Sequence, residues 1–123
     1  MPDTKRAPYA YEGLDRIFHE KARLGIASSL VGHRDGLGFS ELKALCGLTD
    51  GNLSRHLAAL EEAGFVSLEK GYEGKRPHTR CRLTPLGQAR FADYLTALEQ
   101  VLRQATRASA GQNASPDLKE QTP

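Results

Sequence analysis

Residues 39–66 read FSELKALCGLTDGNLSRHLAALEEAGFV, and this stretch decides the fold. Ser40 is a good N-cap for a short helix over 41–46, because its hydroxyl can accept a hydrogen bond from an exposed backbone amide. Gly47 is expected to end that helix after about two turns, since glycine readily takes the left-handed conformation at a helix C-terminus. The apolar stripe of this helix consists of Leu42, Leu45 and Cys46.

A second helix follows after a short connection that contains glycine. Thr49 is its expected N-cap and Gly64 its expected end. Two helices joined in this way are the signature of a helix-turn-helix, a unit whose second helix can enter the major groove of DNA. The apolar face of the second helix consists of Leu53, Leu57 and Leu60.

The hydrophobic period changes from helical to alternating after the second helix. Val66 and Leu68 alternate with polar residues, as do Cys81 and Leu83, which predicts two antiparallel strands. The connection over 71–78 is too long for a two-residue turn, so we expect a protruding loop. Residues 65–84 as a whole are strongly basic, because two acidic residues stand against five basic ones: Lys70, Lys75, Arg76, Arg80 and Arg82.

Helical patterns flank this central unit. Apolar residues between 14 and 31 recur at helical spacing and predict one kinked helix or two short ones. Thr84 followed by Pro85 marks the start of a final helix, because threonine can cap the free amides and proline at the first position sacrifices no hydrogen bond. We expect this helix to run to about Arg107, roughly 33 Å.

Length and composition indicate one small globular domain. The chain has 123 residues, of which 39% are hydrophobic and 26% charged, which is ordinary for a soluble domain. Residues 1–8 and 108–123 lack periodicity and are expected to be disordered, which places the domain at 9–107. No apolar run is long enough to span a membrane and no signal-peptide stretch opens the chain, so we expect a cytoplasmic protein.

The motifs indicate no reaction chemistry. Cys46 and Cys81 are too few for a disulfide scaffold and lack CxxC spacing, and we interpret both as packed thiols. The histidines have no metal-ligand spacing, and the chain shows no nucleophile elbow, phosphate-binding loop or carboxylate pair. We therefore expect no metal, no cofactor and no enzymatic activity. Whether a small-molecule effector exists stays open.

The order of elements resembles that of the winged-helix DNA-binding proteins, in particular the small bacterial regulators of the MarR/ArsR-like type. The resemblance covers about residues 12–106 and rests on FSEL at 39–42, LSRHL at 53–57, LEEAGFV at 60–66 and RLTPLG at 82–87. It implies an α+β fold that is mainly α with a two-stranded β-hairpin: a winged helix-turn-helix with a long C-terminal dimerisation helix at 85–107. It also implies a transcriptional regulator, which we interpret as a repressor, that binds double-stranded DNA sequence-specifically as a homodimer.

The second helix of the helix-turn-helix would carry the base-reading residues. With Leu53 at the centre of its buried face, Asn52, Ser54 and Arg55 point outward or to the flanks. Asn52 can pair with adenine and Arg55 with guanine, whereas Ser54 is less selective. Asp50 is either a cap-region residue or a cytosine reader. The alternative for all these residues is a solvated helix surface without a partner.

Other contacts to DNA are expected from the start of the same helix and from the basic loop. Thr49 and His56 would bind phosphates, and Gly51 would let the backbone approach the DNA closely. The basic loop would contact the backbone or the minor groove, because clustered positive charge in a projecting loop suits phosphate binding. Its expected contact residues are Lys75, Arg76, His78 and Arg80.

The last helix would form the dimer. Its apolar residues continue farther than one small core needs, and surplus apolar surface at helical spacing calls for a partner. The alternative is that the stripe folds back on the first helix of its own chain. The expected interface residues are Leu14, Ile17, Phe18, Phe91, Tyr94, Leu95, Leu98, Val101 and Leu102.

A second function class stays open. The winged helix can also serve as a protein-interaction or RNA-binding module without sequence-specific DNA readout. Polar residues capable of base pairing on the outer helix face favour DNA, whereas an apolar outer face would have favoured a protein partner.

Overall fold

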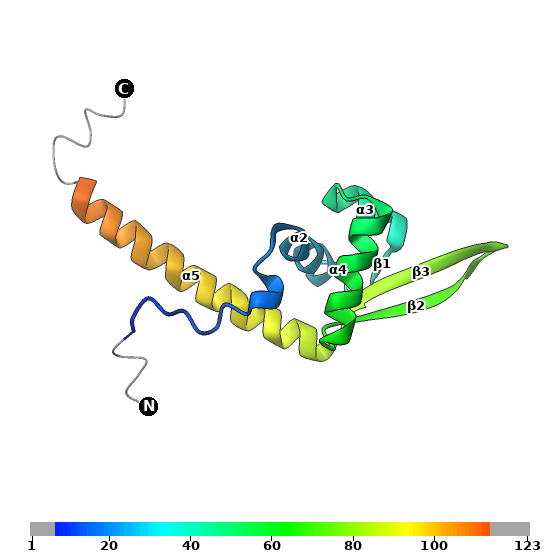
Figure 1. The fold of residues 1–123 in the computed structure, drawn as a ribbon, viewed down its shortest axis with the longest axis horizontal. Helices are drawn as coiled ribbons and strands as arrows, with labels where there is room; N and C mark the ends of the chain where they lie inside the picture. Colours follow the sequence, from blue (N-terminus) through cyan, green and yellow to red (C-terminus); the bar gives the residue numbers. More distant parts are fainter. Residues whose placement is uncertain (1–6, 114–123) are drawn as a thin grey trace, which may run out of the picture.

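The computed structural model describes residues 7–113 and shows a helical body with a long helix on one side and a projecting hairpin on the other (Figure 1). The region expected as one kinked helix or two short ones is a 3-10 turn followed by an α-helix. The elements are η1 (Arg16–Phe18), α2 (Lys21–Val31), β1 (Leu37–Gly38), α3 (Phe39–Cys46), α4 (Asp50–Glu62), β2 (Val66–Glu73), β3 (Arg76–Leu83) and α5 (Pro85–Asn113).

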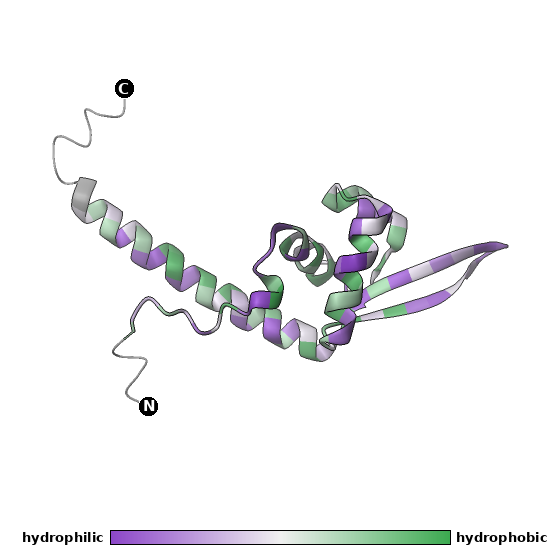
Figure 2. Cartoon of the chain, in the orientation of Figure 1, coloured by the Kyte–Doolittle hydropathy of each residue, from purple (hydrophilic) through white to green (hydrophobic). Residues whose placement is uncertain are grey.

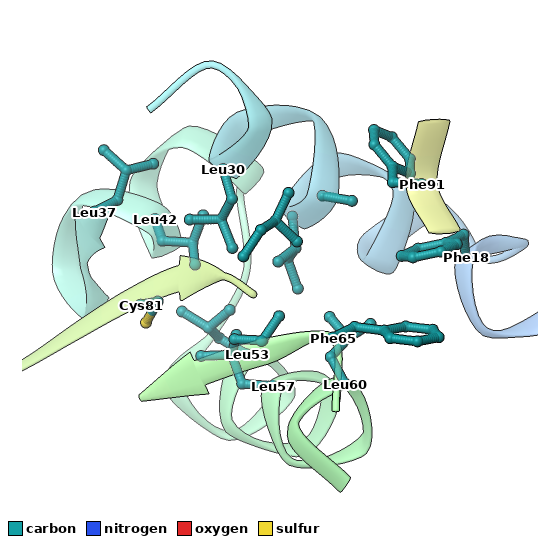
Figure 3. Packing of buried hydrophobic residues seen from close by; sticks show 14 of the residues in the cluster. Phe18, Leu30, Leu37, Leu42, Leu53, Leu57, Leu60, Phe65, Cys81 and Phe91 are labelled. Carbon is teal, nitrogen blue, oxygen red and sulfur yellow. The ribbon is translucent and has the colours of Figure 1, made fainter. Parts of the chain in front are cut away.

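The core lies where α2, α3, α4 and the sheet meet, and it extends to the first turns of α5 (Figure 3). Leu53 and Leu57 of α4 are buried, as the helical period predicts. At the other end of the core, the ring of Phe18 lies 5.2 Å from that of Phe65 and 5.1 Å from that of Phe91. These contacts fix the helix-turn-helix on a rigid support.

The helix-turn-helix forms as expected, with one correction at its start. Helix α3 begins at Phe39, and Gly38 is its N-cap instead of Ser40. The Glu41 carboxylate accepts a hydrogen bond from the Gly38 backbone N–H at 2.8 Å, which satisfies an amide at the helix start. At the other end, Gly47 has a φ of 65°, the left-handed conformation that ends the helix.

The caps of the later helices are confirmed. The Thr49 hydroxyl accepts a hydrogen bond from the Asn52 backbone N–H at 3.1 Å and so caps α4. The Thr84 hydroxyl accepts from the Gly87 N–H at 2.9 Å and donates to the Gly64 carbonyl at 2.6 Å. Thr84 therefore caps α5 and ties it to the segment that follows α4.

The hairpin differs from the expected strands and loop. Strands β2 and β3 continue to Glu73 and Arg76, so the connection is a two-residue turn of Gly74 and Lys75 and not a loop over 71–78. Gly74 has a φ of 66° and Lys75 is not among the residues with positive φ, as in the tight hairpin turn that has glycine first. The basic residues thus lie on a rigid ribbon.

The sheet has three strands and not the expected two. Leu37 pairs with Cys81 and Gly38 with Arg80, so β1 joins the outer edge of β3 in the order β1-β3-β2. A strand of two residues carries no alternating pattern, which is why the sequence does not reveal it.

Helix α5 is longer than expected. It covers 29 residues and reaches Asn113, so residues 108–113, expected in a disordered tail, are helical. The N-terminal segment lies beside it: the Tyr11 hydroxyl donates to the Gln104 side chain, and the Asp15 carboxylate is 3.9 Å from Arg90. The rest of the expected disordered termini, 1–6 and 114–123, lies outside the described residues.

Candidate nucleic-acid interface

The first two turns of α4 present a polar surface to solvent. Asn52, Ser54 and Arg55 are all exposed, and so is Gly51, where an added Cβ would meet no other atom within 4 Å. Thr49 is exposed as well, although its hydroxyl caps the helix. The expected base readers therefore stand together on one outward face, while the leucines of the same helix hold it on the core.

Asp50 belongs to the support of this surface. Its carboxylate lies 2.8 Å from the Lys43 ammonium of α3. Both side chains are substantially exposed, so the ion pair contributes little to stability. It nevertheless offsets the acidic charge beside the base readers, which favours the cap-region interpretation over a cytosine reader.

His56 is a correction to the sequence analysis. It was expected to bind phosphate, but it is only 3% exposed and lies beneath the surface of α4. Its Nδ1 atom lies 3.1 Å from a carboxylate oxygen of Glu20 and 3.1 Å from Nε of Arg23, and both of these residues belong to the start of α2. A ring that is held inside the chain in this way has no route to a phosphate.

The opposite edge of the His56 ring faces a predicted base reader. Nε2 of His56 lies 3.4 Å from Nη2 of Arg55. Burial lowers the pKa of His56 from its usual value of 6.5, the Glu20 carboxylate opposes that change, and the Arg55 and Arg23 guanidinium groups reinforce it. The ring is thus held neutral between two cations near neutral pH.

These four side chains, Glu20, Arg23, Arg55 and His56, form what we call the His56 cluster. Sequence reasoning missed it because Glu20 and Arg23 precede the helix-turn-helix and show no spacing that links them to α4. One signal was present: His56 lies about 60° from Leu53 around the helix, at the margin of the apolar face. The cluster borders a groove between α2, α3 and α4, where Leu48, Cys46 and Asn52 also lie.

The hairpin formed by β2, β3 and their turn, hereafter the wing, carries fewer available charges than its sequence indicates. The Arg82 guanidinium donates to the Glu69 carboxylate at 2.9 Å. Arg80 donates to the backbone carbonyls of Asp35 and Gly36 at 3.0 and 3.1 Å. Arg80 was expected on DNA, but its Nη1 is instead used to hold the loop before β1.

His78 is also drawn back from the expected contact surface. Its side chain is 28% exposed, and Nδ1 lies 3.7 Å from the Glu73 carboxylate. Its ring is packed so closely on Gly38 that an added Cβ there would lie 2.8 Å from it. By contrast, within residues 7–113 the basic side chains at the outer part of the wing, Lys70, Lys75 and Arg76, form no ion pair.

The distal part of the wing is coloured mainly hydrophilic in Figure 2 and extends away from the body beside α4. Lys75 lies in its turn, and Arg76 follows at the start of β3, opposite Glu73. A stiff, exposed ribbon with unpaired positive charge at its end suits contact with a phosphate backbone.

The expected dimer residues divide into three groups by burial. Phe18, Phe91 and Tyr94 are buried in the core of their own chain, with at most 2% exposed, so the prediction that they form a dimer interface is wrong. They pack there because the first turns of α5 close the aromatic end of the core. Leu95 and Leu102 are 43% and 60% exposed. The half-buried residues of the expected interface are Leu14, Ile17, Leu98 and Val101.

Neither a metal site nor a membrane span is found in the described part of the chain. Across residues 7–113, no three side chains among histidine, cysteine, aspartate and glutamate come together to hold a metal ion. No helix between these limits combines the length and apolarity that crossing a bilayer requires.

Comparison with known proteins gives consistent matches. The model of a family described as the winged helix DNA-binding domain matches residues 22–112. An uncharacterized protein from Methanocaldococcus jannaschii is 36% identical over 86 residues, which cover 70% of this chain and 92% of that protein.

Solved structures share the architecture. A transcriptional regulator homologue protein from Pyrococcus horikoshii OT3 is 28% identical, with a TM-score of 0.68 over 85% of this chain and 98% of that one. The M. tuberculosis transcriptional regulator MOSR, solved in complex with DNA, has a TM-score of 0.61 at 22% identity over 91% of this chain and 92% of that one, which indicates a common fold.

Proposed function

This chain belongs to the winged-helix DNA-binding domain family, and from that premise we propose that it regulates transcription by sequence-specific binding to double-stranded DNA as a homodimer. The observation that carries the proposal is the polar outward face of α4. Asn52 and Arg55 stand exposed on its first two turns while its leucines are buried. An Asn side chain can make two hydrogen bonds to adenine, and an Arg side chain two to guanine, in the major groove.

The wing supplies the second part of the interface. The wing extends away from the helical body next to α4 (Figure 1). With α4 in the major groove, the wing would therefore lie over the adjacent DNA backbone. Lys75 and Arg76 at its end are free to bind phosphates or the edge of the minor groove. These contacts add affinity without base specificity, whereas those of α4 provide the specificity.

The exposed side of α5 supports the homodimer. Leu95 and Leu102 are separated by seven residues, so they lie on one face of the helix two turns apart. Leu102 also borders a shallow depression with Arg103 and Thr106. Two chains that pair through this face would relate their α4 helices by a two-fold axis, and the operator would be an inverted repeat with half-sites about 34–36 Å apart.

Repression follows from this geometry when the operator overlaps a promoter, because a bound dimer occupies the DNA that RNA polymerase must contact. The M. tuberculosis regulator of the same fold was solved bound to DNA, which supports the DNA-binding part of the proposal. The proposed role requires no catalytic step and no bound cofactor.

The experiment is a binding selection followed by titration. Wild-type protein selects duplexes from a random-sequence library, and binding to the selected duplex and to a scrambled duplex is then measured by gel shift at two salt concentrations. Arg55→Ala should cost about 1–3 kcal/mol on the selected duplex and much less on the scrambled one. Glu62→Ala, at the far end of the same helix, is the matched control and should leave this discrimination unchanged.

Two results would refute the proposal. One is a library that yields no consensus after selection. The other is equal affinity of the wild-type protein for selected duplex, scrambled duplex and single-stranded RNA, which would indicate the RNA-binding or protein-interaction module instead.

A further inference from the structure

We propose that His56 is a positioning residue for base readout: its buried imidazole orients the Arg55 guanidinium, and Glu20 holds the ring in the form that does so. This inference rests on the proposed function, because it assigns the device that aims one base-reading side chain. Arg55 is exposed, and a long side chain in water samples many rotamers. One hydrogen bond from beneath can preselect the rotamer that reaches the groove.

The ring is arranged for this role. His56 points into the chain from α4, with one edge toward α2 and the other toward Arg55. Nδ1 lies 3.1 Å from the Glu20 carboxylate, and Nε2 lies 3.4 Å from Nη2 of Arg55. Arg and Lys side chains can only donate, so contact with the guanidinium requires an accepting nitrogen on the ring.

Two neutral forms of the ring compete. In the first, Nδ1 carries the proton and donates to Glu20, which leaves Nε2 free to accept from Arg55. In the second, Nε2 carries the proton and points it at the guanidinium, while Nδ1 accepts from Arg23 at 3.1 Å. The first form makes two hydrogen bonds, one of them to the Glu20 carboxylate, but sets the Nδ1–H against the Nε–H of Arg23, whereas the second makes one, to Arg23, and repels Arg55. Glu20 therefore selects the form that binds Arg55.

In the first form the Nε–H of Arg23 loses its acceptor on the His56 ring. Arg23 keeps an ion-pair contact with Glu20, because its Nε lies 3.9 Å from the carboxylate, so the two side chains stay associated at the start of α2. Glu20 is 49% exposed and Arg23 is 20% exposed, which lets water satisfy their remaining polar atoms. The cluster therefore links the first turn of α2 to the guanidinium on α4.

Protonation of His56 would abolish this arrangement. The imidazolium has no accepting nitrogen, and it would add a positive charge between Arg23 and Arg55. The charged and titratable groups that face or border it are Glu20, Arg23 and Lys21 from α2, Arg55 from α4 and Cys46 from α3. Glu20 alone among them carries negative charge, and acidification therefore favours release of Arg55.

The test compares two substitutions at this position on the selected and scrambled duplexes. His56→Leu fills a similar volume but offers no acceptor, and it should weaken binding to the selected duplex about five- to tenfold relative to the scrambled one, the value of one hydrogen bond. His56→Gln can accept from Arg55 through its carbonyl and donate to Glu20 through its amide. It should recover discrimination to within about twofold of wild type.

A double-mutant cycle separates positioning from general structure. When Arg55 is already alanine, His56→Leu should change the discrimination by less than about twofold, because it has no guanidinium left to orient. The same loss with and without Arg55, or equal weakening on both duplexes, would overturn the inference. A wild-type protein that selects no duplex would instead refute the proposed function.

A pH profile tests the inference even if the His56→Leu variant fails to fold. As the pH falls below about 6.5, wild-type discrimination between the two duplexes should fall several-fold, because burial places the pKa of His56 below that value and the ring gains its proton there. His56→Gln should keep a flat profile, and circular dichroism should show unchanged helix content in both proteins. Parallel profiles for wild type and His56→Gln would overturn the inference, because the titrating group would then lie elsewhere.

Discussion

The wing offers a quantitative test of how this chain binds DNA. Arg76→Ala removes a guanidinium that forms no ion pair within residues 7–113 and lies at the end of the wing beside the turn. Arg82→Ala makes the same change in charge at the base of the wing, where the guanidinium is already bonded to Glu69. The two variants have equal net charge, so any difference between them reports position and pairing.

The expected magnitude follows from counterion release. Each lost phosphate contact lowers the slope of log K against log salt by about 0.9, so a dimer with two wings should lose about 1.8. Between 50 and 200 mM salt, each contact then changes the relative affinity by about 3.5-fold. Arg82→Ala should shift the slope by less than about 0.3 per protomer, because the Glu69 carboxylate already neutralises that charge.

The assay is a salt titration of wild type, Arg76→Ala and Arg82→Ala on both selected and scrambled duplexes. The slope change for Arg76→Ala should be the same on both duplexes, because phosphates carry no sequence information. Equal slopes for Arg76→Ala and wild type would remove the end of the wing from the interface. A loss confined to the selected duplex would reassign Arg76 to base readout.

Four further outcomes are expected. The double variant Leu95→Glu/Leu102→Glu should be a monomer with unchanged helix content and much weaker DNA binding, whereas Ala108→Glu, on another face of α5, should stay dimeric. Sedimentation measures the oligomeric state, and a wild-type protein that is monomeric at tens of micromolar would contradict the expectation. Thr84→Ala should lower the free energy of unfolding by about 2 kcal/mol, of which about 1 comes from the lost helix cap and about 1 from the unpaired Gly64 carbonyl. The control Thr84→Ser should unfold within about 0.5 kcal/mol of wild type in urea titrations. Burial raises the pKa of Cys81 from 9.0 to about 11, so iodoacetamide at neutral pH should label Cys46 in the folded protein and Cys81 only after unfolding. Because the thiol ionises less readily in the folded protein, its contribution to the free energy of unfolding is complete below about pH 9 and is lost as the pH rises toward 11. The urea midpoint should therefore decline less at alkaline pH in Cys81→Ala than in wild type.

The helix-turn-helix could be predicted because its signals are local. A cap such as Thr49, a stop such as Gly47 and the period of the leucines on α4 each act within a few residues, and each is confirmed in the structure. The same holds for Thr84 at the start of α5. Neighbouring peptide groups set these features, so the amino-acid sequence is sufficient to find them.

The length of the wing and the third strand were not available from such signals. The sequence favoured a loop over 71–78 because it contains glycine and proline, but pairing between β2 and β3 continues through Tyr72 and Pro77 to the turn. Strand β1 exists only because β3 offers it an open edge. Pairing between distant segments decides both features.

The candidate site shows the same division. Its outward face on α4, with Asn52 and Arg55, follows from helical phase and was predicted. The role of His56 was not, because Glu20 and Arg23 reach it across 36 and 33 residues of sequence. Arg80 and Arg82 likewise look identical as charges in a list of residues, yet one holds a loop and the other pairs with Glu69.

By itself, the sequence determined the helix-turn-helix, the presence of the β2–β3 hairpin, the start of α5 and which side of α4 faces outward, since backbone geometry repeats at fixed periods. Only the tertiary structure decided which charges are free, which histidine is buried and which leucines of α5 remain uncovered. Those outcomes depend on the distance between side chains from separate elements. Hydrophobic periodicity carries no information about that distance, because the distance is fixed only when the elements pack together.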